Sequence, residues 1–216
     1  MFLCLKNLSN LGHLSLNIST WVYLIWFIPQ LYLNFKRHDT RGLSLHMHGI
    51  LSLGYLCDWC YGGGLAMPWQ YRFVTLVGLI SLAIQHYQWG CYGLHTRWDR
   101  RAYLFWSFVF LIFIFIYVCL TLGFIKISHV NYDRIGMVSN ICWFTYMLPQ
   151  IIKNYVNHST KGLSFYFVLI ALFLNLCDAT SAWTLGWDYP SKIGAGIAFF
   201  KNGILLAQIF YFKNKI

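Results

Sequence analysis

The stretch Pro-Gln-Leu-Tyr-Leu-Asn-Phe at 29–35 decides the fold, because the chain contains it twice. It returns at 149–155 as Pro-Gln-Ile-Ile-Lys-Asn-Tyr, 120 residues further on. The same offset relates further positions without a gap: His38, Thr40, Gly42, Leu43, Ser44, Cys57, Asp58 and Gln88 return as His158, Thr160, Gly162, Leu163, Ser164, Cys177, Asp178 and Gln208. Self-similarity at a fixed period indicates that one supersecondary unit was duplicated.

The composition is typical of a membrane protein. Of the 216 residues, 58% are hydrophobic and only 10% are charged, which is more apolar than a soluble domain of this size. A membrane helix needs about 20 apolar residues. The sequence predicts seven such spans in a single membrane domain, 1–216: 18–35, 43–64, 73–94, 103–125, 135–155, 163–185 and 193–212.

The seven spans divide into two repeats of three helices, 18–94 and 135–212. The span 103–125 has no counterpart and is predicted to be a connector helix. Equivalent positions of the two repeats are separated by four membrane crossings. Because this number is even, both repeats enter the membrane in the same direction. We therefore expect an all-α membrane protein of 3+1+3 helices, with two parallel repeats and a site at the repeat interface near the midplane.

The net charge of +10 is explained by topology. Ten basic residues fall in alternate loops and at the C-terminus, and five fall on the opposite side. This positive-inside bias predicts an N-terminus outside and a C-terminus in the cytoplasm, and it argues against nucleic-acid binding. The short loops favour a bacterial inner membrane over an organelle membrane.

A proline precedes the cytoplasmic end of the first helix in each repeat. Proline removes a backbone hydrogen bond and kinks a helix, and nearby Gln and Asn amides are placed to satisfy the freed carbonyl. One interpretation is a static kink. The other, favoured because both repeats keep it, is a hinge formed by Pro29, Gln30, Pro149 and Gln150.

Two acidic residues, Asp58 and Asp178, occupy equivalent positions deep within apolar spans. Asp58 lies about 22 Å above the start of its helix at 1.5 Å per residue. An ionised carboxylate inside a membrane costs about 2.5–3.5 kcal/mol even on the mild insertion scale. It therefore faces a polar cavity, is paired, or stays protonated, and its duplication favours a functional role.

A single base, Lys201, lies in the last span, and its equivalent in the first repeat is Ser81. Two acids therefore share one base. In the functional hypothesis one Asp pairs with Lys201, while the other carries a proton or contacts a substrate ammonium; Lys201 could instead bind a substrate carboxylate. The alternative is a buried Asp178–Lys201 ion pair that only locks two helices.

The two Pro-Gln-x-x-x-Asn segments, each followed by a Ser/Thr-x-Gly-Leu-Ser turn, resemble the PQ-loop superfamily. This group includes the SWEET sugar carriers, cystinosin and the lysosomal cationic amino-acid exporters. The resemblance covers about 21–95 and 141–215. It implies alternating access, with a small polar solute held between the two triplets of helices. It also makes Asn34 and Asn154 candidates to line the cavity.

The chain departs from both branches of this family. Leu51 and Ala171 stand where cystinosin-type carriers hold an acidic residue. Asp58 and Asp178 stand where small bacterial SWEET-like proteins carry a pocket Trp. The substrate of neither branch can therefore be transferred to this chain.

We therefore expect a transporter of a small polar solute that works by alternating access, first of all a proton-coupled amino acid carrier. One alternative is a SWEET-like sugar facilitator, in which both Asp would be neutral hydrogen-bonding partners. Another is a non-transporting membrane receptor of similar fold. The expected partners are the solute, protons and membrane lipids, and the oligomeric state stays open. The residue pattern suggests no enzyme, cofactor or metal site.

Overall fold

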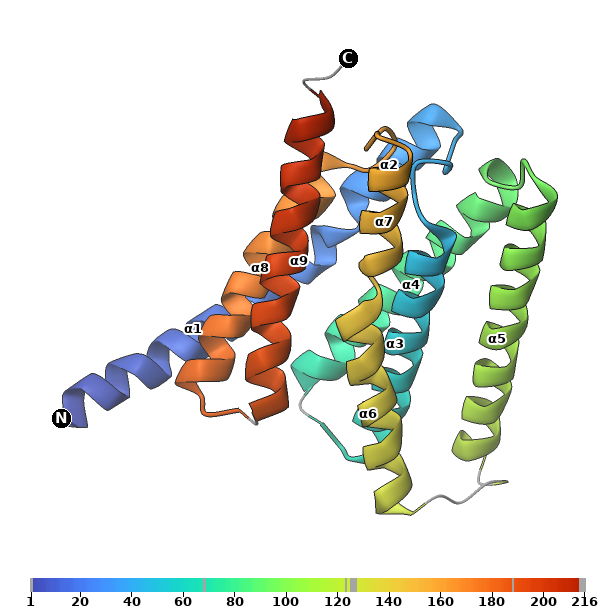
Figure 1. The fold of residues 1–216 in the computed structure, drawn as a ribbon. Coiled ribbons are helices and arrows are strands. Elements are labelled where there is room, and N and C mark those ends of the chain that lie inside the picture. Colours follow the sequence, from blue (N-terminus) through green and yellow to red (C-terminus); the bar gives the residue numbers. More distant parts are fainter. Residues whose placement is uncertain (1, 68, 123, 125–127, 188, 214–216) are drawn as a thin grey trace. The chain divides into compact units, whose positions relative to one another are not determined.

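The computed structural model describes residues 2–67, 69–122, 124, 128–187 and 189–213, and the described part is helical without strands (Figure 1). The helices within these residues are α1 (Phe2–Trp26), α2 (Ile28–Arg37), α3 (Leu45–Gly64), α4 (Trp69–Tyr92), α5 (Arg97–Thr121), α6 (His129–Thr145), α7 (Leu148–Val156), α8 (Phe165–Thr184) and α9 (Tyr189–Lys213). They cover the seven predicted spans, and the predicted end of the connector, residue 125, lies outside the described residues.

The first and fifth predicted spans are each broken just before their proline. The break separates α1 from α2 and α6 from α7, so that Pro29 and Pro149 each lie in the first turn of a short helix. Proline has no N–H to donate, so the first hydrogen bonds of the short helix come from the residues that follow it. The Gln30 and Leu31 N–H groups both reach the Phe27 carbonyl, at 3.1 and 3.0 Å. The kink predicted from the sequence is therefore present at both positions.

The first span begins earlier than the predicted 18–35. The helix starts at Phe2, and the stretch Leu8–Arg37 is long and apolar enough to cross a membrane. Two hydroxyl groups near the start of this stretch are satisfied within the protein. Thr20 donates to the Leu16 carbonyl at 2.7 Å, and Ser15 donates to the Cys177 carbonyl of α8 at 3.0 Å. Such internal hydrogen bonds remove the cost of placing hydroxyls in an apolar helix.

Five segments of the described residues meet a length and hydropathy criterion for crossing a membrane: Leu8–Arg37, Arg97–Leu120, His129–Val156, Phe165–Thr184 and Lys192–Phe212. The helices α3 and α4 form where the second and third spans were predicted, but they fall short of that criterion. Their sequences carry His, Asp, Gln and Gly residues, which lower the mean hydropathy.

The short helices α2 and α7 end in the same way. His38 and His158 both adopt a left-handed conformation with φ of 47°. After α2, the His38 N–H donates to the Phe35 carbonyl and the Asp39 N–H to the Asn34 carbonyl; after α7, the equivalent bonds form. This pair of bonds is a Schellman motif, in which glycine is usual.

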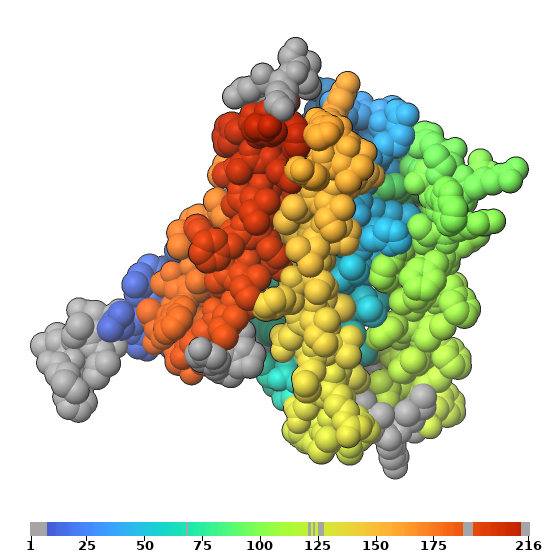
Figure 2. Space-filling model, in the orientation of Figure 1, coloured from blue at the N-terminus to red at the C-terminus, as the bar shows by residue number. Residues whose placement is uncertain are grey.

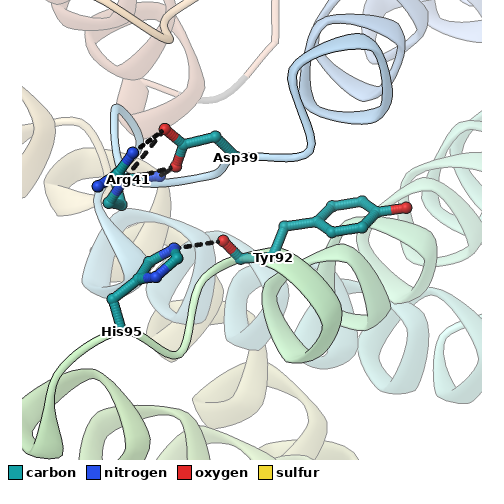
Figure 3. A network of polar contacts seen from close by, with 4 residues as sticks. All are labelled: Asp39, Arg41, Tyr92 and His95. Atoms are coloured by element: carbon teal, nitrogen blue, oxygen red, sulfur yellow. Dashed lines mark hydrogen bonds and ion pairs between the residues drawn. The ribbon is translucent and has the colours of Figure 1, made fainter.

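The loop after α2 carries an exposed ion pair, drawn in Figure 3. The Arg41 guanidinium lies 2.9 Å from the Asp39 carboxylate, and the Arg41 backbone N–H donates to the same group at 2.8 Å. These bonds hold the pKa of Asp39 below its usual value. In the same view, His95 donates to the Tyr92 carbonyl at the end of α4.

Serine residues start the second helix of each repeat. The side chain of Ser44 accepts from the Met47 N–H at the start of α3, and Ser164 accepts from the Phe167 N–H at the start of α8. Both bonds satisfy backbone donors that have no partner inside the helix.

The chain divides into two compact units, each described here by itself. One unit comprises Met1–Leu33 and Ile151–Ile216, and in it α8 packs against both α1 and α9 (Figure 1). The other comprises Asn34–Gln150, and in it α3 packs against α4, α5 and α6. The predicted repeats, 18–94 and 135–212, are units of sequence, and their first helices are exchanged between the two packed units.

Each unit has an aromatic core. In the first, the Trp26 ring stacks on Phe167 with centroids 5.3 Å apart, and the Trp26 indole N–H donates to the Phe167 carbonyl. In the second, α3 and α5 approach closely, because a Cβ at Gly49 would stand 2.1 Å from the Trp106 ring. The outward face of α5, green in Figure 2, is apolar and exposes Phe105, Phe108, Leu111 and Phe115.

Candidate functional site

Asp58 on α3 lies at the centre of the first candidate site, where three side chains from two other helices donate to its carboxylate. One oxygen, Oδ1, accepts from the Tyr71 hydroxyl of α4 at 2.6 Å and from the Ser139 hydroxyl of α6 at 2.5 Å. The other, Oδ2, accepts from the Trp143 indole N–H at 2.7 Å. Only 9% of Asp58 is exposed. We call Asp58, Tyr71, Ser139 and Trp143 the Asp58 site.

Asp178 on α8 has the equivalent neighbours in the other unit. The Tyr23 hydroxyl of α1 donates to its Oδ2 at 2.8 Å, and Ser19, one turn earlier on α1, donates to the Leu16 carbonyl at 3.0 Å. Ser19 and Tyr23 stand 120 residues before Ser139 and Trp143. Asp178, Ser19 and Tyr23 form what we call the Asp178 site.

Both aspartate sites are built by the exchanged helices. In each, the acid comes from the second helix of one repeat, and an aromatic donor, Tyr23 or Trp143, comes from the first helix of the other repeat. Hydrogen bonds from hydroxyl and indole groups stabilise an ionised carboxylate more strongly than a neutral acceptor. The named donors are all neutral side chains.

The two aspartates differ in how exposed they are and in how many hydrogen-bond donors contact them. Asp58 is buried and has three donors, whereas Asp178 is half-buried. Asp178 also has unsatisfied amides in its own unit. The Nδ2 atom of Asn175, three residues before Asp178 on α8, and the Oδ1 atom of Asn202 on α9 are buried and have no partner within the described residues.

Lys201 lies in the same unit as Asp178, on α9, and is only 6% exposed. Its neighbour Asn202 is 1% exposed and donates through Nδ2 to the Ala198 carbonyl. Buried polar atoms without a protein partner are uncommon, and water or a ligand usually satisfies them. Asn175 and Asn202 were missed by the sequence analysis, because neither has an equivalent polar amide in the first repeat, where Tyr55 and Leu82 stand.

The glutamines of the Pro-Gln pairs bind the turns that precede the second helices. In one unit, Gln30 donates to the Gly162 carbonyl at 2.9 Å and accepts from the Ser164 N–H at 2.7 Å. Gln150 makes the same two bonds in the other unit, to Gly42 at 3.0 Å and from Ser44 at 2.6 Å. We call these two arrangements the glutamine clamps.

The clamps give the predicted hinge residues a role that the sequence did not reveal. Each side-chain amide satisfies one backbone donor and one backbone acceptor of a turn in the opposite repeat. This explains why a Pro-Gln pair and a Gly-Leu-Ser turn occur together in both copies: each copy of the motif binds the other. The hinge itself stays a prediction.

The predicted cavity residues Asn34 and Asn154 are both buried. Asn34 donates to the Gln88 side chain at 2.9 Å, and Asn154 donates to Gln208 at 3.0 Å. Each pair joins the Pro-Gln helix to the third helix of the same repeat. A role in lining a solute path stays a prediction for both.

No group of three or more His, Cys, Asp and Glu side chains in the described residues is arranged to hold a metal ion. The candidate sites offer hydrogen bonding, charge pairing and proton exchange.

Two exchanged first helices, two equivalent clamps and two equivalent carboxylates define a duplicated helical membrane protein. A model of the PQ loop repeat matches residues 11–61 and 134–191, which together are just over half of the chain. The chain therefore belongs to the PQ-loop repeat family, as the sequence predicted.

The fold is similar to the solved structure of a eukaryotic SWEET transporter. The TM-score is 0.63 at 14% sequence identity, and the match covers 96% of this chain and 99% of the other. The predicted 3+1+3 architecture of seven transmembrane helices is thereby confirmed, and the chain is an integral multi-pass membrane protein. No curated protein matches the sequence significantly.

Proposed function

We propose that this protein carries a small polar solute across the membrane by alternating access, and that the solute is an amino acid moved together with a proton. Family membership and the similarity to a SWEET transporter support the coarser statement, a membrane transporter of a small solute. Transport, and not enzymatic catalysis, is the activity that these similarities favour. The topology with an outer N-terminus and a cytoplasmic C-terminus, in a bacterial inner membrane, is part of the proposal.

The observation that carries the finer proposal is the difference between the two aspartate sites. Asp58 has three donors, so as an anion it is already satisfied and needs no further partner. Asp178 is half-buried, and its unit also holds Lys201 and the unsatisfied amides of Asn175 and Asn202. An amino acid has an ammonium group, which an acid can contact, and a carboxylate group, which a base can contact. The unit of Asp178 holds an acid, a base and two amides that can hydrogen-bond to such a solute.

We therefore assign the solute to the unit of Asp178. In this proposal Asp178 contacts the substrate ammonium or releases a proton to it, and Lys201 contacts the substrate carboxylate. Asp58 holds α3, α4 and α6 together. Asn34 and Asn154 position the Pro-Gln helices, while Pro29, Gln30, Pro149 and Gln150 allow α2 and α7 to move as short rigid pieces.

Uptake into proteoliposomes tests this proposal. With an imposed pH gradient, the unaltered protein is expected to accumulate an amino acid, and Asp178→Asn is expected to lose the dependence on the gradient. Asp58→Asn is the matched control in the equivalent site. It is expected to lower stability while keeping gradient-driven uptake in the protein that remains folded. Full gradient-driven uptake by Asp178→Asn would refute the assigned role.

A sugar facilitator is the second candidate, because the matched fold is that of a SWEET transporter and the named donors at both carboxylates are neutral. Sugar flux that ignores the pH gradient and survives Asp178→Asn would favour it. Ligand binding without any flux would favour a receptor of this fold instead.

A further inference from the structure

A chain of polar side chains, buried at His48 and Gln85 and half-buried at His86 and Ser107, links α3, α4 and the connector α5 within the second unit. The Nδ1 atom of His48 lies 2.9 Å from the Gln85 Oε1, and its Nε2 lies 3.2 Å from the Nδ1 of His86. The Nε2 of His86 lies 2.9 Å from the Ser107 hydroxyl, which donates to the Tyr103 carbonyl at 2.8 Å. We call Gln85, His48, His86, Ser107 and the Tyr103 carbonyl the histidine chain.

Both ends of the histidine chain are hydrogen-bond acceptors. The Gln85 Oε1 and the Tyr103 carbonyl have lone pairs but no hydrogen to donate. For both ends to be hydrogen-bonded, His48 donates through Nδ1 at one end, and Ser107 donates its only hydrogen at the other. The histidine chain has four such contacts, which we call links, and each link needs one hydrogen to be a hydrogen bond.

The neutral side chains supply too few hydrogens for these links. A neutral imidazole carries one N–H, and a serine hydroxyl carries one O–H. His48, His86 and Ser107 together therefore bring three hydrogens to four links. All four distances are nevertheless hydrogen-bond distances. The chain is complete when one of the two rings carries an additional hydrogen.

Two features of the surroundings act on a positive charge in opposite directions. The His86 ring stacks on Tyr103 with centroids 4.5 Å apart, and Phe110 lies edge-on at 5.0 Å. Aromatic faces attract cations, whereas the full burial of His48 disfavours the charged form of its ring. Among the ring contacts of the described residues, Tyr103 is the titratable side chain that faces the pair.

The second repeat lacks this arrangement. Val168, Leu205 and Leu206 stand at the positions equivalent to His48, Gln85 and His86. Helices of this fold therefore pack with apolar residues at these points, and helix packing alone does not require the histidines. The histidine chain occurs in the repeat whose helices pack against the connector.

We propose that the histidine chain is a binding site for one proton, shared by His48 and His86, which fastens the connector α5 to α3 and α4. Loss of the proton leaves one link without a hydrogen, so it breaks a link or turns the Gln85 amide to donate from its NH2 group. The packing of the connector thus depends on the proton. The site is separate from the aspartate sites and does not depend on the identity of the solute.

Nitrogen NMR of the full-length protein, labelled with 15N-histidine and held in lipid nanodiscs, tests the proposal. An imidazolium shows two protonated ring nitrogens, whereas a neutral ring shows one. Signals that disappear in His48→Val and His86→Leu identify the pair. At neutral pH we expect three protonated nitrogens among the four of the pair. Two protonated nitrogens would overturn the proposal and indicate a neutral chain with Gln85 as a donor.

Ser107→Ala is a sharper test. It removes two links, so the two remaining links need only the two hydrogens of neutral imidazoles. We expect the pair to fall from three protonated nitrogens to two at unchanged pH. A purely structural role for Ser107 would leave the count unaltered, and that result would contradict the proposal.

The pH dependence of thermal stability gives an independent measurement, with His48→Val/Gln85→Leu/His86→Leu as the apolar reference. Unfolded histidines titrate near a pKa of about 6.5. Below that pH the unfolded state binds more protons than the pair, and above it the pair binds more. The stability of the unaltered protein relative to the reference should therefore peak near neutral pH and fall on both sides. A plateau that persists to high pH would overturn the proposal.

Discussion

The glutamine clamps give a prediction whose size follows from the structure. In Gln150→Met the volume of the side chain is kept, but its two hydrogen bonds are lost. The half-buried Gly42 carbonyl and the buried Ser44 N–H would then lose these partners. A buried polar group left unsatisfied costs about 1–3 kcal/mol. Partial relaxation of the turn would keep the sum at about 2–4 kcal/mol.

Gln30→Met provides the same test in the other unit, because Gln30 makes the equivalent bonds to Gly162 and Ser164. For a chain of this length, each kcal/mol corresponds to about 2–4 °C in Tm. We therefore expect each variant to melt about 4–16 °C below the unaltered protein in detergent. Thermal unfolding followed by circular dichroism measures this shift.

The control for the clamp variants is Tyr32→Phe, at an exposed position of α2, the helix that also carries Gln30. A surface change of this kind is expected to move stability by less than about 0.5 kcal/mol. If both glutamine variants melted within about 1 °C of Tyr32→Phe, the clamps would contribute nothing to the fold and the reasoning would be refuted.

Three further predictions follow from single contacts. Trp143→Phe removes one donor to the buried Asp58 carboxylate and should cost about 1.5–3 kcal/mol in thermal unfolding, and an unchanged Tm would contradict the charge-assisted bond. His38→Gly should be about 1 kcal/mol more stable than His38→Ala, because only glycine enters the left-handed region without cost; equal melting temperatures would argue against that conformation. Because Arg41 lowers the pKa of Asp39, their stabilisation is present above the unfolded pKa of about 3.9 and is lost as pH falls through the folded value. For this exposed pair it should stay below about 1 kcal/mol, and a carboxyl carbon NMR titration that shows an ordinary pKa would contradict it.

The sequence alone located the helices and the breaks in them. Runs of apolar residues mark the membrane spans, because a helix needs about 20 of them to cross the bilayer. A proline interrupts a helix because it has no N–H to donate. These are local properties, so they can be read along the chain. The start of the first span was placed too late, since Ser15 looks polar in sequence but is satisfied by the Cys177 carbonyl in the structure.

The duplication also pointed to Asp58 and Asp178 as a pair, but it did not reveal what surrounds them. The donors to Asp58 include Trp143, 85 positions away, and the donor to Asp178 is Tyr23, 155 positions away. The serine recurs at the same offset, as Ser19 and Ser139, whereas Tyr23 recurs as Trp143, so the repeat alone did not mark these residues as neighbours of the acids. Only packing shows which helix brings them to the acid.

The sequence by itself thus determined that this protein is a duplicated bundle of membrane helices. Hydropathy and an internal repeat are both properties of the linear sequence, so neither needs the tertiary structure to be recognised. The tertiary structure decided that the first helices are exchanged and that Gln30 and Gln150 clamp turns of the opposite repeat. It also brought His48 and His86 together. The physical reason is that each of these contacts joins polar groups from different helices, and a partner on another helix is fixed by packing and not by the local pattern of residues.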